Sequence, residues 1–201
     1  YYSANNAKFG FKGDFVTAPE ISALFGRTLA RQAIQLFRQF GQTSILEFGA
    51  GSGKLAFDLL TELEQFDQLP TQYLILEISA ELQQRQRSLF ETHAPQLLDR
   101  ITWLTELPEQ FSGLIIANEV LDAMPTHLIV WKKDELFERG VSVDQQAFTW
   151  SDKPLINNEL LAIANQLSTL IDRNEANFVS YLSEISLANR YFIHSLSKIL
   201  Q

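Results

Sequence analysis

The feature that most constrains the fold of this chain is a glycine-rich turn between an apolar run and a helical pattern. The turn reads Glu47-Phe48-Gly49-Ala50-Gly51-Ser52-Gly53, after the apolar residues 44–48 and before the amphipathic residues 54–66. In such a turn, one glycine permits the tight connection from strand to helix, one lets a ligand contact the bare backbone, and one lets the helix pack closely on the strand. The amides that begin the helix would face that ligand. The sequence therefore predicts an open α/β sheet with a ligand site after its first strand.

Two common glycine loops can be compared with this turn. A P-loop requires a glycine five residues before its Gly-Lys pair and Ser or Thr after the lysine. Here Phe48 holds the first position and Leu55 follows Gly53-Lys54, so a P-loop is excluded. A dinucleotide-binding loop requires Gly-x-Gly-x-x-Gly or the variant that ends in alanine. Only the variant matches here, when the motif is read from Gly51 and ends at Ala56.

The full spacing Gly-x-Gly-x-Gly after Glu47 resembles the S-adenosylmethionine (SAM) motif of Rossmann-like methyltransferases. A turn without a ligand is the alternative. A second acidic residue, after Glu47, indicates that the ligand contains a nucleoside. This residue is Glu77, which lies at the end of the apolar run 73–78. A carboxylate there can accept hydrogen bonds from both hydroxyls of a ribose. A glycine loop after the first strand together with an acid after the second is compatible with SAM and with NAD alike.

Alternating patterns extend the predicted parallel sheet, and a different pattern follows it. Buried strands are expected at 101–104 and 113–117, with a helix over 79–93 between the second and third strands. An antiparallel β-meander is predicted from the runs 127–132, 135–143 and 146–150, followed by helices at 160–171 and 187–200. We expect one domain over residues 1–201, divided into an N-terminal loop and helix (1–42), a cofactor-binding α/β core (43–126), a β-meander (127–152) and a helical segment (153–201). The first helix is expected to start at Thr17-Ala18-Pro19-Glu20.

Polar residues also follow the fourth predicted strand. Asn118 and Glu119 come directly after it, and Asp122 stands three residues further on. The ends of parallel strands share one edge of a sheet, so these residues are expected to face the crevice of the glycine loop. They are candidates for binding a substrate, with the alternative that Asp122 caps a helix and Glu119 is structural.

Three blocks together resemble one family. Gly13-Asp14-Phe15-Val16-Thr17-Ala18-Pro19-Glu20-Ile21-Ser22, Leu46-Glu47-Phe48-Gly49-Ala50-Gly51-Ser52-Gly53-Lys54-Leu55 and Asn118-Glu119-Val120-Leu121-Asp122-Ala123-Met124-Pro125 are similar to the MidA-like family. This family includes the mitochondrial complex I assembly factor methyltransferase, which methylates arginine on a respiratory-complex subunit, and its bacterial relatives. The resemblance implies a class I SAM-dependent methyltransferase. It also implies that the chain is truncated at both ends.

The resemblance and the chemistry of a guanidinium suggest roles for individual residues. Paired carboxylates suit this planar cation, so Glu119 and Asp122 are predicted to hold it while Asn118 orients it. Gly49, Gly51, Gly53 and Glu77 are predicted to bind the cofactor. Glu47 could reach its amino group through water, or else cap the loop. Gly13 and Asp14 are expected to fold over the cofactor, with a simple turn as the alternative.

The composition argues against a metal site, nucleic-acid binding and a membrane span. There are no cysteines, and His93, His127 and His194 are scattered, so no metal site is expected. The net charge of −8 without a basic cluster disfavours nucleic-acid binding, and no apolar run is long enough to span a bilayer. We expect a protein substrate. The protein itself is expected in the cytoplasm if it is bacterial and in the mitochondrial matrix if it is eukaryotic. The sequence does not indicate an oligomeric state. The competing functions are a catalytically silent, partner-binding subunit with the same fold and a nucleotide-dependent oxidoreductase.

Overall fold

The computed structural model describes residues 17–41, 43–173 and 177–201. The chain divides into two compact units, Tyr1–Ala123 with Leu196–Gln201, and Met124–Ser195. We call them the first and second units, and each is described by itself.

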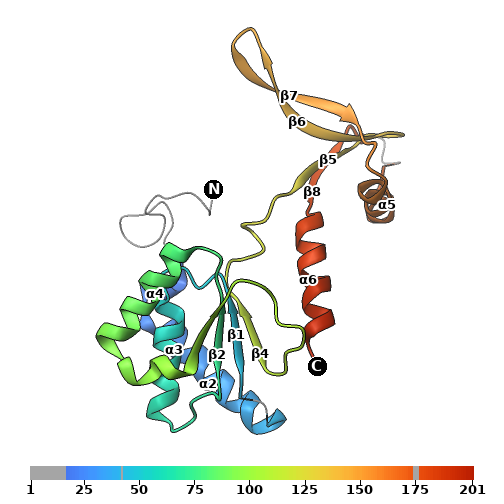
Figure 1. Ribbon diagram of the computed structural model, residues 1–201. Coiled ribbons are helices and arrows are strands. Elements are labelled where there is room, and N and C mark those ends of the chain that lie inside the picture. Colours follow the sequence, from blue (N-terminus) through green and yellow to red (C-terminus); the bar gives the residue numbers. More distant parts are fainter. Residues whose placement is uncertain (1–16, 42, 174–176) are drawn as a thin grey trace. The chain divides into compact units, whose positions relative to one another are not determined.

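A parallel four-stranded sheet is the centre of the first unit (Figure 1). Its strands lie in the order β3-β2-β1-β4, so that β1 is flanked by β2 and β4. The strands are β1 (Ile45–Phe48), β2 (Tyr73–Leu76), β3 (Ile101–Leu104) and β4 (Leu114–Ala117). All three strand pairs are parallel, which confirms the sheet expected from the strand–helix alternation. Every residue of β1 is buried, as expected for its three apolar residues, and the fourth, Glu47, is buried with them.

Helices α3 and α4 connect the first three strands. Helix α3 (Lys54–Gln65) begins directly after the glycine loop, and α4 (Ala80–His93) follows β2. Ser79, the first residue of the helix predicted over 79–93, caps α4, because its side chain accepts a hydrogen bond from the Leu82 amide at 3.4 Å. A 3-10 helix, η1 (Pro95–Arg100), then leads into β3.

The first predicted helix is two helices. Helix α1 (Ala18–Ile21) stops at Ser22, whose side chain caps α2 (Ala23–Phe40) by accepting from the Leu24 amide at 3.1 Å. The predicted start is confirmed, because α1 begins at Ala18 directly after Thr17, although the Thr17 side chain makes no capping bond. The single helix expected to continue from this start is instead interrupted at Ser22. The reason is local: Ser22, five residues after Thr17, has extended backbone angles and caps a new helix with its side chain.

Helix α2 packs closely on α3. A side chain at Gly26 would place its Cβ 2.7 Å from Cβ of Asp58, so only glycine allows this approach. Apolar residues of α2, α3, α4 and the sheet then form one core, which includes Ala33, Ile34, Leu59, Ile75 and Phe90. This core holds the sheet that carries the glycine loop.

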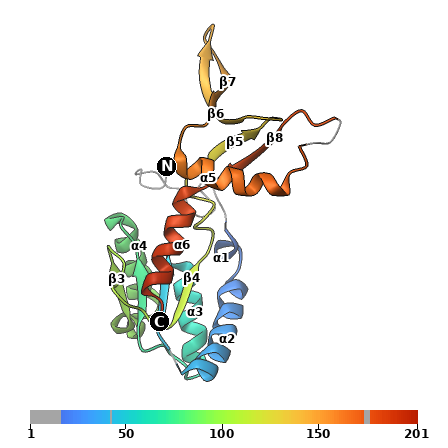
Figure 2. The same ribbon diagram turned by 90° about the vertical axis from the view of Figure 1, so that its right-hand side faces the viewer.

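An antiparallel sheet with the order β7-β6-β5-β8 forms the second unit (Figure 2). Its elements are β5 (His127–Trp131), β6 (Leu136–Asp144), β7 (Ala147–Pro154), α5 (Asn158–Leu167), η2 (Ser168–Leu170) and β8 (Tyr181–Ile185); helix α6 (Leu187–Ile199) runs from this unit into the first. The β-meander is confirmed. Strand β8 was not predicted and lies inside the segment 153–201 that was expected to be helical. Its sequence is mixed and half exposed, and it becomes a strand by pairing with β5, about fifty residues earlier in the chain.

The β6–β7 hairpin extends past the other two strands of its sheet (Figure 2). Strand β5 pairs with β6 only from Leu136 to Arg139, whereas β7 pairs with β6 as far as Asp144. None of the helices in the described part of the chain is long and apolar enough to cross a membrane.

Candidate functional site

The register of the parallel sheet brings three predicted site residues to one edge. Phe48, the last residue of β1, is level with Leu76 of β2 and with Ala117 of β4. The next residues of the three strands are Gly49, Glu77 and Asn118, and these strands lie side by side (Figure 1). The predicted glycine loop, ribose carboxylate and substrate residues therefore start at the same level of neighbouring strands. This is the edge where open α/β sheets bind ligands.

The three glycines of the loop adopt left-handed backbone angles. Their φ values are 65° for Gly49, 55° for Gly51 and 86° for Gly53. A Cβ at Gly49 would also lie 3.1 Å from Cγ2 of Val120, which follows β4. The Gly53 amide donates to the Ala50 carbonyl at 2.8 Å, which closes the turn before α3. The conformation therefore requires glycine for backbone reasons, as the sequence pattern predicts.

A residue that the sequence did not single out holds this loop from α4. Gln86 is fully buried and donates from Nε2 to the Gly51 carbonyl at 3.0 Å. Its Oε1 accepts from the indole of Trp103 at 2.8 Å. The only signal in the sequence is position, because Gln86 and Phe90 are one helical turn apart on the buried face of an otherwise polar helix.

The loop has a second tether, which comes from α1. The hydroxyl of Ser52 donates to the carboxylate of Glu20 and accepts from the Lys54 amide at 3.2 Å. Glu20 belongs to the first of the three blocks that resemble the MidA-like family, and this contact explains how that block reaches the loop. Gly13 and Asp14 of the same block lie outside the described residues, so their predicted roles stay predictions.

Glu77 is placed where a ribose carboxylate is expected. Its backbone amide donates to the Leu104 carbonyl at 2.9 Å, which continues the pairing of β2 with β3. One carboxylate oxygen, Oε1, accepts from the Ser79 amide at 2.9 Å. This bond fixes the direction of the side chain and leaves the second oxygen for a ligand.

Glu47 lies inside the sheet. It is the third residue of β1, is 2% exposed, and accepts a hydrogen bond from the Tyr73 hydroxyl at 2.8 Å. Burial raises the pKa of the Glu47 carboxyl from its usual 4.5 to about 7, although the bond from Tyr73 acts in the lowering direction. Burial and the neighbouring carboxylate raise the pKa of Tyr73 well above 10.0. Glu47 therefore has a partner within the sheet, and its contact with the cofactor stays a prediction.

The residues after β4 form an open turn. Glu119 is exposed and has a φ of 51°, an unusual value for a residue with a side chain. Asp122 is also exposed and lies in a turn, so it does not cap a helix. Among the residues that the structure describes, neither carboxylate has a hydrogen bond or an ion pair. Both are therefore available to a ligand, and their predicted role in binding a substrate stays a prediction.

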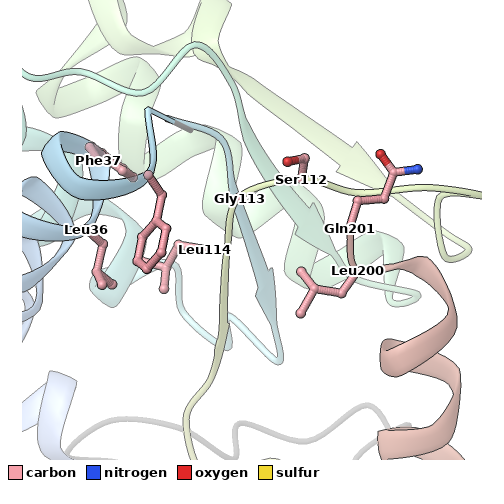
Figure 3. A pocket seen from close by; sticks show the side chains of 8 residues that line it. Leu36, Phe37, Ser112, Gly113, Leu114, Leu200 and Gln201 are labelled. Atoms are coloured by element: carbon pink, nitrogen blue, oxygen red, sulfur yellow. The ribbon is translucent and has the colours of Figure 1, made fainter.

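A pocket of about 430 Å³ lies at the opposite edge of the sheet (Figure 3). Its walls include Phe37 and Phe40 of α2, Leu114 at the start of β4, and Leu200. Because Leu114 is level with Ile45, the first residue of β1, this pocket is at the start of the strands and away from the glycine loop. In the described part of the chain, no group of three or more acidic or histidine side chains could hold a metal ion.

These features define a Rossmann-like nucleoside-binding protein, with a glycine loop after β1 and an acid after β2. Residues 28–201 match a family of S-adenosyl-L-methionine-dependent methyltransferases, and the chain belongs to this family. The resemblance to the MidA-like family is thereby confirmed, and SAM, the cofactor predicted from the sequence, is the one that this family uses.

Named relatives and solved structures agree with this assignment. The mitochondrial protein arginine methyltransferase NDUFAF7 homolog of Drosophila melanogaster is 32% identical over 149 residues, which are 63% of this chain and 34% of the relative. The NDUFAF7 protein of Danio rerio is 27% identical over 205 residues, which are 87% of this chain and 46% of the relative. The crystal structure of a COG1565 superfamily member from Burkholderia thailandensis with bound S-adenosyl-homocysteine is 39% identical, with a TM-score of 0.82 over 96% of this chain and 49% of that one. This chain thus spans between a third and a half of these proteins' lengths.

The residues at this edge suit SAM. The left-handed glycines expose backbone to a ligand, and Glu77 offers a fixed carboxylate at the end of the next strand. SAM carries a ribose with two hydroxyls and a charged amino-acid end, which match a carboxylate and helix-start amides. This chain's own residues would therefore bind and orient the cofactor, which supplies the methyl group.

Proposed function

We propose that this protein transfers a methyl group from SAM to a protein side chain, with the guanidinium of arginine as the acceptor. The observation that carries this proposal is the pair of exposed carboxylates, Glu119 and Asp122, in the turn after β4, beside the strand that bears the glycine loop. The names of the curated relatives, protein arginine methyltransferases, support the same acceptor.

The chemistry explains why carboxylates suit this acceptor. A guanidinium nitrogen attacks the methyl carbon in line with the bond to sulfur; the new C–N bond forms as the C–S bond breaks, and S-adenosyl-homocysteine leaves. The nitrogen then gives up a proton to a carboxylate or to water. Because methyl transfer depends mainly on placing the nucleophile about 3 Å from the methyl carbon, the carboxylates need only hold and orient the guanidinium.

The remaining roles follow from this reaction. Asn118, directly after β4, would orient the substrate by hydrogen bonding. The substrate would be a protein, and a respiratory-complex subunit is one candidate. The relatives named above are mitochondrial proteins, so the matrix is the site of action if this protein is eukaryotic, and the cytoplasm is the site if it is bacterial.

The test is methyl transfer by the full-length protein. Radiolabelled SAM is incubated with a lysate that lacks the endogenous enzyme, and the labelled protein is hydrolysed to identify the modified residue. Labelled methylarginine is the expected product. Label on another residue would overturn the arginine acceptor, and tight SAM binding without any transfer would support the silent partner-binding subunit.

A matched pair of variants tests the role of Glu119. Glu119→Gln keeps the size of the side chain but removes its charge, and should raise the KM for the protein substrate at least tenfold. Glu91→Gln, an exposed substitution on α4, is the control and should have no effect. Wild-type turnover with an unchanged KM in Glu119→Gln would remove Glu119 from the site.

A further inference from the structure

The side chain of Gln86 joins three elements around the glycine loop. It extends from α4, donates to the Gly51 carbonyl of the loop and accepts from Trp103 of β3. It has no exposed surface, although a buried amide is costly unless its polar groups are bonded. Here both ends of the amide are bonded. Such a residue stabilises one particular arrangement of its neighbours rather than a general apolar core.

The orientation of this amide is determined by Trp103. An indole N–H can only donate, so it must face the oxygen of the Gln86 amide. The nitrogen of the amide therefore has to face Gly51, whose carbonyl can only accept. On the outer side, the Arg87 guanidinium lies over the Trp103 ring, 4.1 Å from its centroid, and packs against the indole.

The bond to Gly51 also orients the backbone of the loop. In a trans peptide the carbonyl and the next amide point in opposite directions, so the Ser52 N–H points away from Gln86. The next two amides are used within the turn: Gly53 donates to the Ala50 carbonyl, and Lys54 donates to the Ser52 hydroxyl. Among the described residues, the Ser52 N–H has no acceptor. It is a backbone donor at the start of α3, and thus available to a ligand.

Close packing ties α4 to the same loop. A Cβ at Gly53 would lie 3.0 Å from Cγ of Gln86, so the loop and this side chain are in direct contact. A change at Gln86 would therefore be felt first at Gly51 and Gly53, the two glycines nearest the start of α3.

We propose that Gln86 is a positioning residue of the cofactor site: held by Trp103, it fixes the Gly51–Ser52 peptide in the orientation that binds SAM and S-adenosyl-homocysteine. Gln86 itself acts through the loop and does not need to touch the cofactor. The proposal concerns the cofactor alone, so it does not depend on whether arginine is the methyl acceptor.

Calorimetry with S-adenosyl-homocysteine on the full-length protein tests this proposal. Gln86→Leu removes both hydrogen bonds at similar size, and should weaken binding about tenfold or more. Gln86→Glu keeps the acceptor for Trp103 but loses the donor to Gly51, so it should weaken binding as strongly. Gln84→Leu, an exposed change two residues away on α4, is the control and should stay within twofold of wild type.

Two further measurements separate positioning from a general effect on folding. In a SAM titration of the methyl-transfer rate, the Gln86 variants should show a raised KM for SAM, while kcat, reached at saturating SAM, should stay close to the wild-type value. The NMR signal of the Trp103 indole proton should keep its hydrogen-bonded shift in Gln86→Glu and lose it in Gln86→Leu.

Trp103→Phe provides a variant in which Gln86 itself is intact. Removal of the orienting donor should weaken binding by about two- to threefold. The proposal is overturned if a folded Gln86→Leu or Gln86→Glu protein binds S-adenosyl-homocysteine within twofold of wild type. If neither folds, unchanged affinity in Trp103→Phe overturns it. Failure of the wild type to bind would instead contradict the cofactor assignment.

Discussion

The hydroxyl of Tyr73 donates a hydrogen bond to the carboxylate of Glu47 at 2.8 Å, between the first two strands of the parallel sheet. Both side chains are buried, and burial is the larger influence on the pKa of each. A carboxyl in this place binds its proton more tightly than it does in the unfolded chain. The stability of the first unit should therefore depend on pH near neutrality.

The sign of this dependence follows from the raised pKa of Glu47. The contribution of Glu47 to the free energy of unfolding is fully present below pH 4.5. It is lost as the pH rises through about 7, because the folded protein must then ionise a buried group. Glu47→Gln is neutral at every pH and can still accept from Tyr73. We expect it to be more stable than wild type at pH 8 by on the order of 2 kcal/mol, and to show a flatter pH profile of Tm between pH 5 and 8. Parallel profiles for the two proteins would contradict this explanation, and Glu91→Gln is the exposed control.

Gly53→Ala tests the backbone of the loop. The new Cβ would meet Gln86 at 3.0 Å in a residue with a φ of 86°, so we expect a loss of stability of about 1–2 kcal/mol. The affinity for S-adenosyl-homocysteine should fall as well, because the loop must shift. Gly140→Ala in β6 is the matched control, since its Cβ would meet no atom within 4 Å. Calorimetry and thermal unfolding measure both effects, and equal behaviour of the two variants would refute the argument.

Glu77→Gln tests the ribose contact. The amide oxygen of glutamine can still accept from Ser79, so we expect little change in the Tm of the cofactor-free protein. The loss of a charged acceptor for ribose hydroxyls should weaken SAM binding about 10- to 100-fold. Glu81→Gln, an exposed change in the first turn of α4, should leave the affinity unchanged. If Glu77→Gln binds SAM as wild type does, Glu77 does not hold the ribose.

Two tryptophans of the second unit should differ sharply in their effect on stability. Trp131 is 1% exposed and donates to the Ala164 carbonyl and to the Ser168 hydroxyl, both at 3.1 Å. Trp150 is 62% exposed on the β6–β7 hairpin. Trp131→Ala should cost about 3–5 kcal/mol, whereas Trp150→Ala should cost less than about 1 kcal/mol. Urea unfolding followed by circular dichroism compares them, and similar midpoints would contradict the core described here.

Strands with strong local patterns could be predicted from the sequence. The four strands of the parallel sheet were found within two residues of their bounds, because each is a short apolar run beside a turn or helix signal. Strand β8 could not be found this way, since Tyr181–Ile185 alternates weakly and depends on β5 for its pairing. The break at Ser22 was missed for a related reason: the apolar spacing continues across it, while only the backbone angles reveal the new cap.

The sequence by itself determined the chemistry of the candidate site. The spacing of Gly49, Gly51 and Gly53 and the acid at Glu77 follow from local rules, since left-handed turns need glycine and strand ends lie at one edge. Only the tertiary structure decided how the loop is held. Glu20 and Gln86 contact it from residues more than thirty positions away, and Glu47 turns to Tyr73 inside the sheet. Such partners depend on which side chains the packed core brings within hydrogen-bond distance, and no local pattern encodes that.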